Sequence, residues 1–213
     1  MQHGRYSTED AARKMQHSRM KHVWNSARMD AEQKNDMRER TGLVQIYSGD
    51  GKGKTTAGMG QCVRAAGYGY KVLIFQFLKD NSGNERKAME RIPGIVFEEG
   101  PQTVKFSFRM SPEEKQEQKR WYEEKLKMVF QRAAEERFDL LFLDEALYAV
   151  RGGLLDEDLL VRLIKERPEN LEILLTGQDP GERLTALCDY HSEIQKRKHP
   201  YDAGQTARDG IER

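Results

Sequence analysis

A chain of 213 residues is long enough to bury the core of a single domain of ordinary size. Charged residues make up 33% of the chain, yet the formal net charge is only +1, so acidic and basic residues nearly balance. This balance argues against a protein dedicated to binding nucleic acid, because such proteins carry a clear basic excess.

The sequence contains no recognisable targeting or membrane segment. No apolar run approaches the roughly 20 residues that a transmembrane helix needs, and no apolar segment follows the first few residues. We therefore expect a cytoplasmic protein. The two cysteines, Cys62 and Cys188, are too few for a disulfide framework or a thiolate metal site, so we expect two reduced thiols.

Residues 1–41 differ in composition from the rest of the chain. They are rich in charged residues, Gln and Met and contain no strand-like run, which is typical of a polar arm. Within this arm, Met20, Val23, Trp24 and Ala27 recur at the spacing of one helix face. Two interpretations stay open, a solvated arm and a short amphipathic helix that docks on the domain formed by residues 42–213.

Apolar strand-like runs alternate with helix-like segments in the rest of the chain. The expected strands are residues 43–47, 71–77, 95–97, 140–143 and 171–175. The expected helices are residues 54–66, a long one opening at Ser111, 156–166 and 181–189. Strands that alternate with helices predict an α/β protein with a mainly parallel central sheet covered on both faces. The fold class expected is therefore the three-layer P-loop NTPase fold of the RecA-like kind.

The helix that opens at Ser111 has the clearest start signal. A proline follows Ser111 in the first turn, and Ser111 and Glu114 together form a capping box. We expect its buried face to carry apolar residues at helical spacing, namely Trp121, Leu126, Val129 and Ala133.

The strongest functional motif lies between the first expected strand and the helix after it. It comprises Gly49, Asp50, Gly51, Lys52, Gly53, Lys54, Thr55 and Thr56. Its glycines let backbone N–H groups converge on phosphate oxygens, and the N-terminus of the following helix adds partial positive charge. Lys54 can reach the terminal phosphates and Thr55 can ligate Mg²⁺. The usual pattern has a glycine at the position of Ser48, so we expect a loop of somewhat different shape.

An acidic pair supplies the second signal. Asp144 and Glu145 follow four apolar residues of an expected strand. In P-loop folds a carboxylate at this place holds Mg²⁺ directly or through water, so we expect Asp144 and Glu145 to bind the metal together with Thr55. The alternative is that these residues merely close a strand. A weaker cluster, residues 76–79 with residues 84–86, follows another strand at the carboxyl edge of the sheet, where open α/β proteins bind ligands.

The motifs, taken in order, resemble those of one enzyme family. They are GDGKGKTT, Arg64, QFLK, NER, LDEALY and KHPYDAGQTARDGIE, and they run from about Gly42 to the C-terminus. This set is similar to the ATP:corrinoid adenosyltransferases, also called cob(I)yrinic acid a,c-diamide adenosyltransferases. The resemblance implies that a corrinoid in the Co(I) state attacks the 5′ carbon of ATP and that triphosphate leaves. It also implies that the phosphate loop and Arg64 bind ATP, and the family likewise lacks the first loop glycine.

The resemblance implies partners and further residues as well. The corrinoid would be cobyrinic acid diamide, cobinamide or cobalamin, reduced by an electron donor such as a flavoprotein, and the protein would be a homodimer acting in adenosylcobalamin synthesis or salvage. Phe106 and Phe108 match the aromatic residues that remove the lower ligand of cobalt, with two core phenylalanines as the alternative. In related proteins an N-terminal helix covers the corrinoid site, and our hypothesis is that the stripe at residues 20–27 does the same here.

In the reaction that the resemblance implies, Co(I) is itself the nucleophile, so no catalytic Ser, Cys or His is required. The residues expected to act in catalysis are Lys54, Thr55 and Glu145, which would stabilise the leaving triphosphate together with Mg²⁺. Two other function classes compete with this interpretation. One is a P-loop ATPase or small-molecule kinase that transfers the γ-phosphoryl group and yields ADP. The other is a RecA-like module acting on DNA, which salt-sensitive DNA binding would favour.

Overall fold

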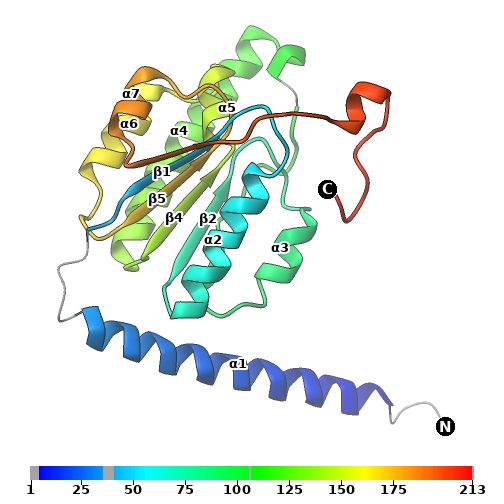
Figure 1. Ribbon diagram of the computed structural model, residues 1–213, viewed down its shortest axis with the longest axis vertical. Coiled ribbons are helices and arrows are strands. Elements are labelled where there is room, and N and C mark those ends of the chain that lie inside the picture. The colour runs from blue at the N-terminus through cyan, green and yellow to red at the C-terminus, as the bar shows by residue number, and fades with distance from the viewer. Residues whose placement is uncertain (1–4, 36–40, 106, 213) are drawn as a thin grey trace.

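The computed structural model of the chain describes residues 5–35, 41–105 and 107–212. Its strands form one sheet in the order β3-β2-β4-β5-β1-β6, and all neighbouring strands are parallel (Figure 1). The strands are β1 (Val44–Ser48), β2 (Val72–Gln76), β3 (Ile95–Phe97), β4 (Leu140–Asp144), β5 (Glu172–Thr176) and β6 (Tyr190–Glu193). The expected parallel α/β architecture is confirmed.

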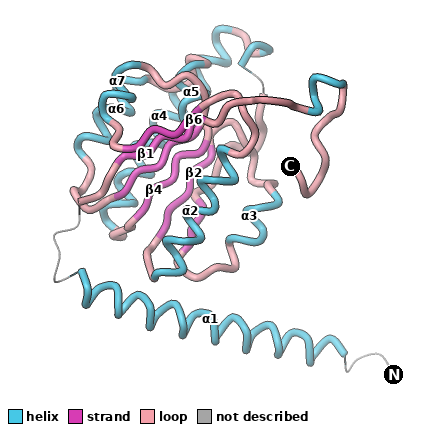
Figure 2. Tube along the Cα trace, viewed as in Figure 1, coloured by secondary structure: helices cyan, strands magenta, loops and turns pink. Residues whose placement is uncertain are grey.

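Helices cover the sheet, and two short 3₁₀ turns complete the described elements (Figure 2). The helices are α1 (Arg5–Asn35), α2 (Lys54–Tyr68), α3 (Asn84–Met89), α4 (Pro112–Glu135), α5 (Ala146–Arg151), α6 (Glu157–Glu166) and α7 (Glu182–Leu187). The 3₁₀ turns are η1 (Ser107–Arg109) and η2 (Pro200–Ala203). Among the residues that the structure describes, no helix combines the length and the apolar character needed to cross a membrane.

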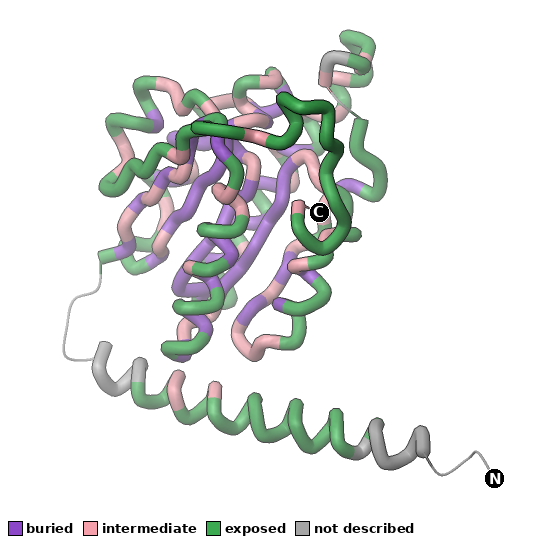
Figure 3. The backbone as a smooth tube through the Cα atoms, turned by 45° about the vertical axis from the view of Figure 1, so that its right-hand side comes forward, coloured by how far each residue is buried: buried purple, intermediate pink, exposed green. Residues whose placement is uncertain are grey.

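The core consists of two apolar layers, one on each face of the sheet. Side chains alternate along a strand, so Leu73 and Phe75 of β2 pack on the side of α4 and α6, whereas Val72 and Ile74 pack on the side of α2. The central strands are buried on both faces (Figure 3). The arrangement is therefore three-layered, as the sequence predicts.

Helix α4 begins as predicted but buries a different aromatic residue. The Ser111 hydroxyl accepts a hydrogen bond from the Glu114 N–H and the Glu114 carboxylate accepts one from the Ser111 N–H, which completes the capping box. The expectation that Trp121 packs in the core is wrong, because 36% of Trp121 is exposed whereas Tyr122 is buried. Tyr122 is four residues before Leu126 and shares its face, and Trp121 lies one residue outside that phase.

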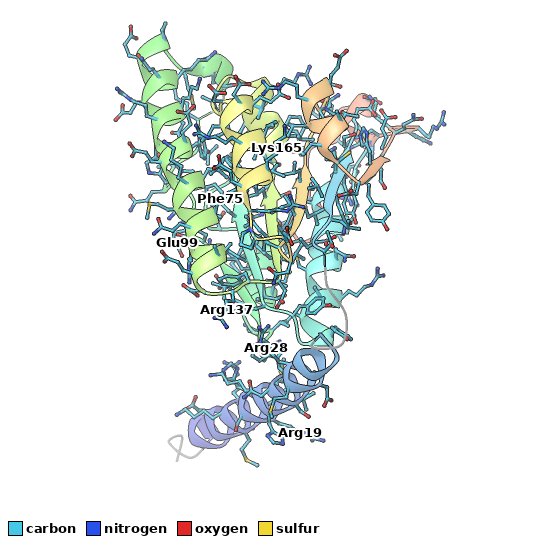
Figure 4. The ribbon with its side chains drawn as sticks, turned by 90° about the vertical axis from the view of Figure 1, so that its left-hand side faces the viewer. Arg19, Arg28, Phe75, Glu99, Arg137 and Lys165 are labelled. Atoms are coloured by element: carbon cyan, nitrogen blue, oxygen red, sulfur yellow. The ribbon has the colours of Figure 1, made fainter. Side chains whose placement is uncertain are left out.

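Helix α1 is longer than the short amphipathic segment expected, and it contacts the edge of the sheet at which β2, β3 and β4 begin. Arg28 Nη1 donates to Asp139 Oδ2 at 2.7 Å and to the Gly69 carbonyl at 3.3 Å. The Trp24 indole packs against Gly94, which has a φ of 89° and no side chain to obstruct it. In Figure 4, Arg28 lies at the junction between α1 and the sheet domain, and Arg19 lies farther along the helix. The phosphate loop follows β1 and lies at the opposite edge of the sheet, where the parallel strands end. A role for this arm over the active site stays a prediction.

Candidate nucleotide and metal site

The phosphate loop connects the end of β1 to the start of α2. Gly49 and Gly53 have φ values of 109° and 119°, which a residue with a side chain would adopt only with strain. Ser48 instead continues β1, and its buried Oγ lies 2.7 Å from His191 Nε2 of β6. Glycine is therefore dispensable at position 48, where the chain is still extended strand.

The segment after β6 lies against the back of this loop. The Gly51 N–H donates to the Ile194 carbonyl at 2.7 Å, and the Lys196 N–H donates to Asp50 Oδ1 at 2.8 Å. A Cβ on Gly51 would lie 2.7 Å from the Ile194 oxygen, so this close approach requires glycine. The hydrogen bond from Lys196 is the main reason why the pKa of Asp50 is lowered. Asp50 thus connects the C-terminal segment to the loop through this hydrogen bond.

A buried carboxylate forms the centre of the site. Asp144, at the end of β4, is fully buried. Its Oδ1 accepts hydrogen bonds from Thr55 Oγ1 at 3.0 Å and from Thr176 Oγ1 at 2.6 Å. Its Oδ2 accepts from Gln76 Nε2 at 3.0 Å and from Lys79 Nζ at 2.8 Å. Residues from the loop helix and from the ends of the two neighbouring strands, β2 and β5, therefore converge on one carboxyl group at the end of β4.

Glu145 follows in a left-handed conformation, with a φ of 60°. Its N–H donates to Thr176 Oγ1 at 2.8 Å, and its Oε1 lies 3.7 Å from Lys79 Nζ. Burial is the main cause that raises the pKa of Glu145 to about 7, with Asp144 adding to it and Lys79 opposing it. Burial also disfavours the Lys79 ammonium, but the two carboxylates outweigh that effect and raise the pKa of Lys79. Lys79 therefore stays charged beside the acidic pair.

The donor set suits a hard cation such as Mg²⁺. It consists of the Thr55 hydroxyl and the carboxylates of Asp144 and Glu145, all oxygen ligands. Within the described ranges, no group of three or more His, Cys, Asp or Glu side chains could hold a metal. Mg²⁺ in nucleotide sites is usually bound by one or two carboxylates, waters and the substrate phosphates. The residues thus fit a cation that arrives with ATP.

A cavity of about 610 Å³ opens above the loop, a volume in the range of small-molecule sites. Its walls are Gly51, Lys52, Gly53, Lys54, Thr55, Thr56, Met59, Lys79, Asn84, Glu85, Glu145, Tyr148, Gly210, Ile211 and Glu212. Lys54 Nζ donates to the Gly51 carbonyl at 2.9 Å and lies 5.9 Å from the centre of the Tyr148 ring. Burial lowers the pKa of Lys54, although nearby carboxylates oppose the shift.

Most of the expected site residues meet at this cavity, and a few do not. Arg64 is exposed on α2 and is not part of the cavity wall. Phe106 lies outside the described residues, and of Phe108 only the backbone in η1 is described. The ATP contact of Arg64 and the corrinoid contacts of the two phenylalanines stay predictions.

Two residues of the site, Thr176 and Tyr148, were not singled out from the sequence. Thr176 directly follows the expected strand at residues 171–175, and its hydroxyl bonds to both acidic residues. Tyr148 lies in the LDEALY motif, and one turn of α5 brings its ring over Lys54. The signal available for both was a polar residue at or just after the carboxyl end of a parallel strand.

Comparison with known proteins agrees with this geometry. Residues 40–213 match the family described as ATP:corrinoid adenosyltransferase BtuR/CobO/CobP. The corrinoid adenosyltransferase of Escherichia coli K12 is 30% identical over 174 residues, which span 82% of this chain and 87% of that protein. A corrinoid adenosyltransferase of Sinorhizobium is 28% identical over 197 residues, which span 90% and 91%. Corrinoid adenosyltransferase CobA of Salmonella typhimurium is 28% identical over 179 residues, which span 82% and 87%. The chain belongs to the ATP:corrinoid adenosyltransferase family.

Proposed function

We propose that the chain transfers the 5′-deoxyadenosyl group of ATP to the Co(I) centre of a corrinoid and that the phosphate loop binds the triphosphate that leaves. The observation that carries this proposal is the convergence of Lys54, Thr55 and Glu145 on one cavity above the loop. A lysine, a helix N-terminus and an oxygen ligand set that face one space can bind an ATP triphosphate and its cation.

In the reaction, the electron pair of Co(I) forms the new bond to the 5′ carbon. The bond between that carbon and the α-phosphate oxygen breaks, and its electron pair leaves with the triphosphate. The protein has to align the two substrates and stabilise the negative charge of the leaving group. Lys54 supplies a positive charge, and the loop backbone and the N-terminus of α2 supply N–H donors. Mg²⁺ held by Thr55 and by the acidic pair Asp144–Glu145, directly or through water, would neutralise further phosphate charge.

No protein nucleophile is needed in this scheme. A hydroxyl–imidazole pair does occur among the described residues, Ser48 with His191 at 2.7 Å. Ser48 is buried at the end of β1 and is not part of the cavity wall, so this pair is not placed to attack a substrate there. Its position favours a structural role beneath the loop.

Between the two acidic residues, we infer that Glu145 is the direct metal ligand. Asp144 already accepts hydrogen bonds from four side chains, whereas among the described residues Glu145 has one side-chain ion-pair partner, Lys79 at 3.7 Å, and faces the cavity. Glu145→Ala should then raise the Mg²⁺ concentration needed for half-maximal rate more than tenfold. If only Asp144→Ala does so, the assignment is reversed.

Other parts of the proposal concern the surroundings of this site. We infer that residues 42–213 form the adenosyltransferase domain and that residues 1–41 form an arm attached to it. The homodimer, the flavoprotein electron donor and the corrinoid contacts of Phe106 and Phe108 also belong to the proposal, and they rest on the family resemblance. The cytoplasmic location stays the expectation drawn from the sequence.

The test is a single-vessel reaction without oxygen. The full chain is mixed with Mg-ATP and chemically reduced cobalamin or cobinamide, and both the cobalt–carbon product and the phosphorus products are measured. We expect one triphosphate for each organocobalt molecule. Formation of ADP or orthophosphate without an organocobalt product would contradict the proposal and support the γ-phosphoryl transfer alternative.

A further inference from the structure

The Lys79 ammonium lies among the groups that are expected to bind the cation. Its Nζ is 2.8 Å from Asp144 Oδ2, 3.3 Å from Thr55 Oγ1 and 3.7 Å from Glu145 Oε1. These three residues are the donor set assigned above to Mg²⁺. A positive charge of the protein itself therefore contacts every side chain of the metal site.

The backbone just before Lys79 has an unusual conformation that places the Lys79 side chain beside Asp144. Leu78 has a φ of 54°, a conformation that is unfavourable for a residue other than glycine. Its N–H donates to the Tyr122 hydroxyl at 3.0 Å, and the preceding Phe77 N–H donates to the Asp144 carbonyl at 2.9 Å. Strained residues of this kind cluster at functional sites when their surroundings hold them in place. Leu78 turns the chain after β2 so that Lys79 returns over the end of β4.

The buried negative charge of Asp144 requires a positive counter-charge when no metal is bound. Asp144 is fully buried, and Thr55, Thr176 and Gln76 offer it only neutral donors. A buried carboxylate without a counter-charge is costly, and Lys79 provides that charge. A divalent cation in the same place would repel the ammonium at this distance, so both cannot occupy it. Lys79 also lines the cavity together with Lys54, where phosphate oxygens would accept its hydrogen bonds.

We propose that Lys79 holds the place of the divalent cation in the nucleotide-free protein and moves onto the triphosphate when the cation and ATP bind. This inference rests on the proposed function, because it takes Thr55, Asp144 and Glu145 as the metal site. It makes Lys79 a residue with two positions, a counter-ion for the carboxylates first and a phosphate ligand afterwards. Loss of its charge should then have opposite effects on the metal and on the triphosphate.

The test measures Mn²⁺ binding to the full chain by electron paramagnetic resonance, first without nucleotide. We expect Lys79→Met to bind Mn²⁺ at least about tenfold more tightly than the unmodified protein, because a competing charge has been removed. In a second titration with saturating Mg²⁺, we expect the same variant to bind inorganic triphosphate at least about tenfold more weakly. A residue that only supported the fold would not strengthen metal binding.

Three further variants complete the design. Lys79→Arg keeps the charge and should leave the Mn²⁺ affinity close to that of the unmodified protein. Lys105→Met removes an exposed lysine that pairs with Glu114 and should change neither titration. Lys79→Gln is a second neutral variant with a polar side chain, for use if the methionine variant does not fold.

The outcomes separate this inference from the function on which it rests. Unchanged or weaker Mn²⁺ binding by both neutral Lys79 variants, with normal metal binding by the unmodified protein in the presence of triphosphate, overturns the role of Lys79 alone. Absence of Mn²⁺ binding by the unmodified protein with triphosphate overturns the metal site itself, and with it this inference.

Discussion

Thr176 offers the sharpest test of how the acidic centre is built. Its side chain is buried, its hydroxyl donates to Asp144 Oδ1 at 2.6 Å, and the same oxygen accepts from the Glu145 N–H at 2.8 Å. Thr176→Val keeps the shape of the side chain and removes both hydrogen bonds. The variant therefore perturbs the placement of both carboxylates without opening a cavity.

The expected loss of stability can be worked out from these contacts. A hydrogen bond to a carboxylate contributes about 1.5–3 kcal/mol, and a buried N–H without its acceptor costs about 1–3 kcal/mol. The extra methyl group of valine offsets about 1 kcal/mol through apolar burial. We expect Thr176→Val to lower the free energy of unfolding by about 1.5–5 kcal/mol and to weaken Mn²⁺ binding in the presence of triphosphate.

Urea denaturation at constant pH measures this loss, with circular dichroism and tryptophan fluorescence as independent probes. Thr185→Val, on the exposed surface of α7, is the matched control and should stay within about 0.5 kcal/mol of the unmodified protein. A loss for Thr176→Val no larger than that of the control would refute the view that this hydroxyl organises Asp144 and Glu145.

Three further variants test separate parts of the structure. Lys54→Ala should cost on the order of 3 kcal/mol in transition-state stabilisation, which steady-state kcat/KM measures, and a near-normal rate would remove its role at the leaving group. Glu145 has a folded pKa of about 7, above its ordinary value of 4.5, so its contribution to stability is lost as the pH rises through 7. Glu145→Gln should therefore become more stable than the metal-free parent between pH 5 and pH 8, by up to about 3 kcal/mol, and a pH-independent difference between the two denaturation curves would exclude the shift. Gly94→Ala would place a Cβ 2.6 Å from Trp24 Cε2 at a φ of 89°, so it should loosen α1 and change the tryptophan fluorescence, whereas Gly60→Ala in open space should not. Identical fluorescence of the two alanine variants would contradict the docking of α1.

Local signals predicted much of the fold because they act over short stretches of chain. The loop glycines, the cap at Ser111 and the apolar strands each specify their own element, and all are found where expected. Strand β6 was missed because its four residues are all exposed and have no apolar alternation, so only pairing with β1 defines it. Trp121 was misplaced because two adjacent aromatic residues compete for one helix face, and tertiary packing selects Tyr122.

The site was predictable to the extent that its residues belong to contiguous motifs. The motif containing Lys54 and Thr55 and the pair Asp144–Glu145 could be found because each follows a strand at the same sheet edge. The contact of Lys79 with Asp144 depends on the left-handed backbone conformation of Leu78, and no residue type in QFLK predicts that conformation. The contact between Gly51 and Ile194 joins distant parts of the chain and appears only once β6 is in place.

The central claim is that the phosphate loop binds the triphosphate portion of ATP as the future leaving group. Competition between inorganic triphosphate and ATP, with Mg²⁺ present and the corrinoid absent, tests this claim most directly. We predict that triphosphate displaces ATP from the unmodified protein with a comparable Kd, and that Lys54→Met weakens the binding of both at least about tenfold. Binding of ATP that triphosphate does not displace, or equal triphosphate affinity in the variant, would contradict it.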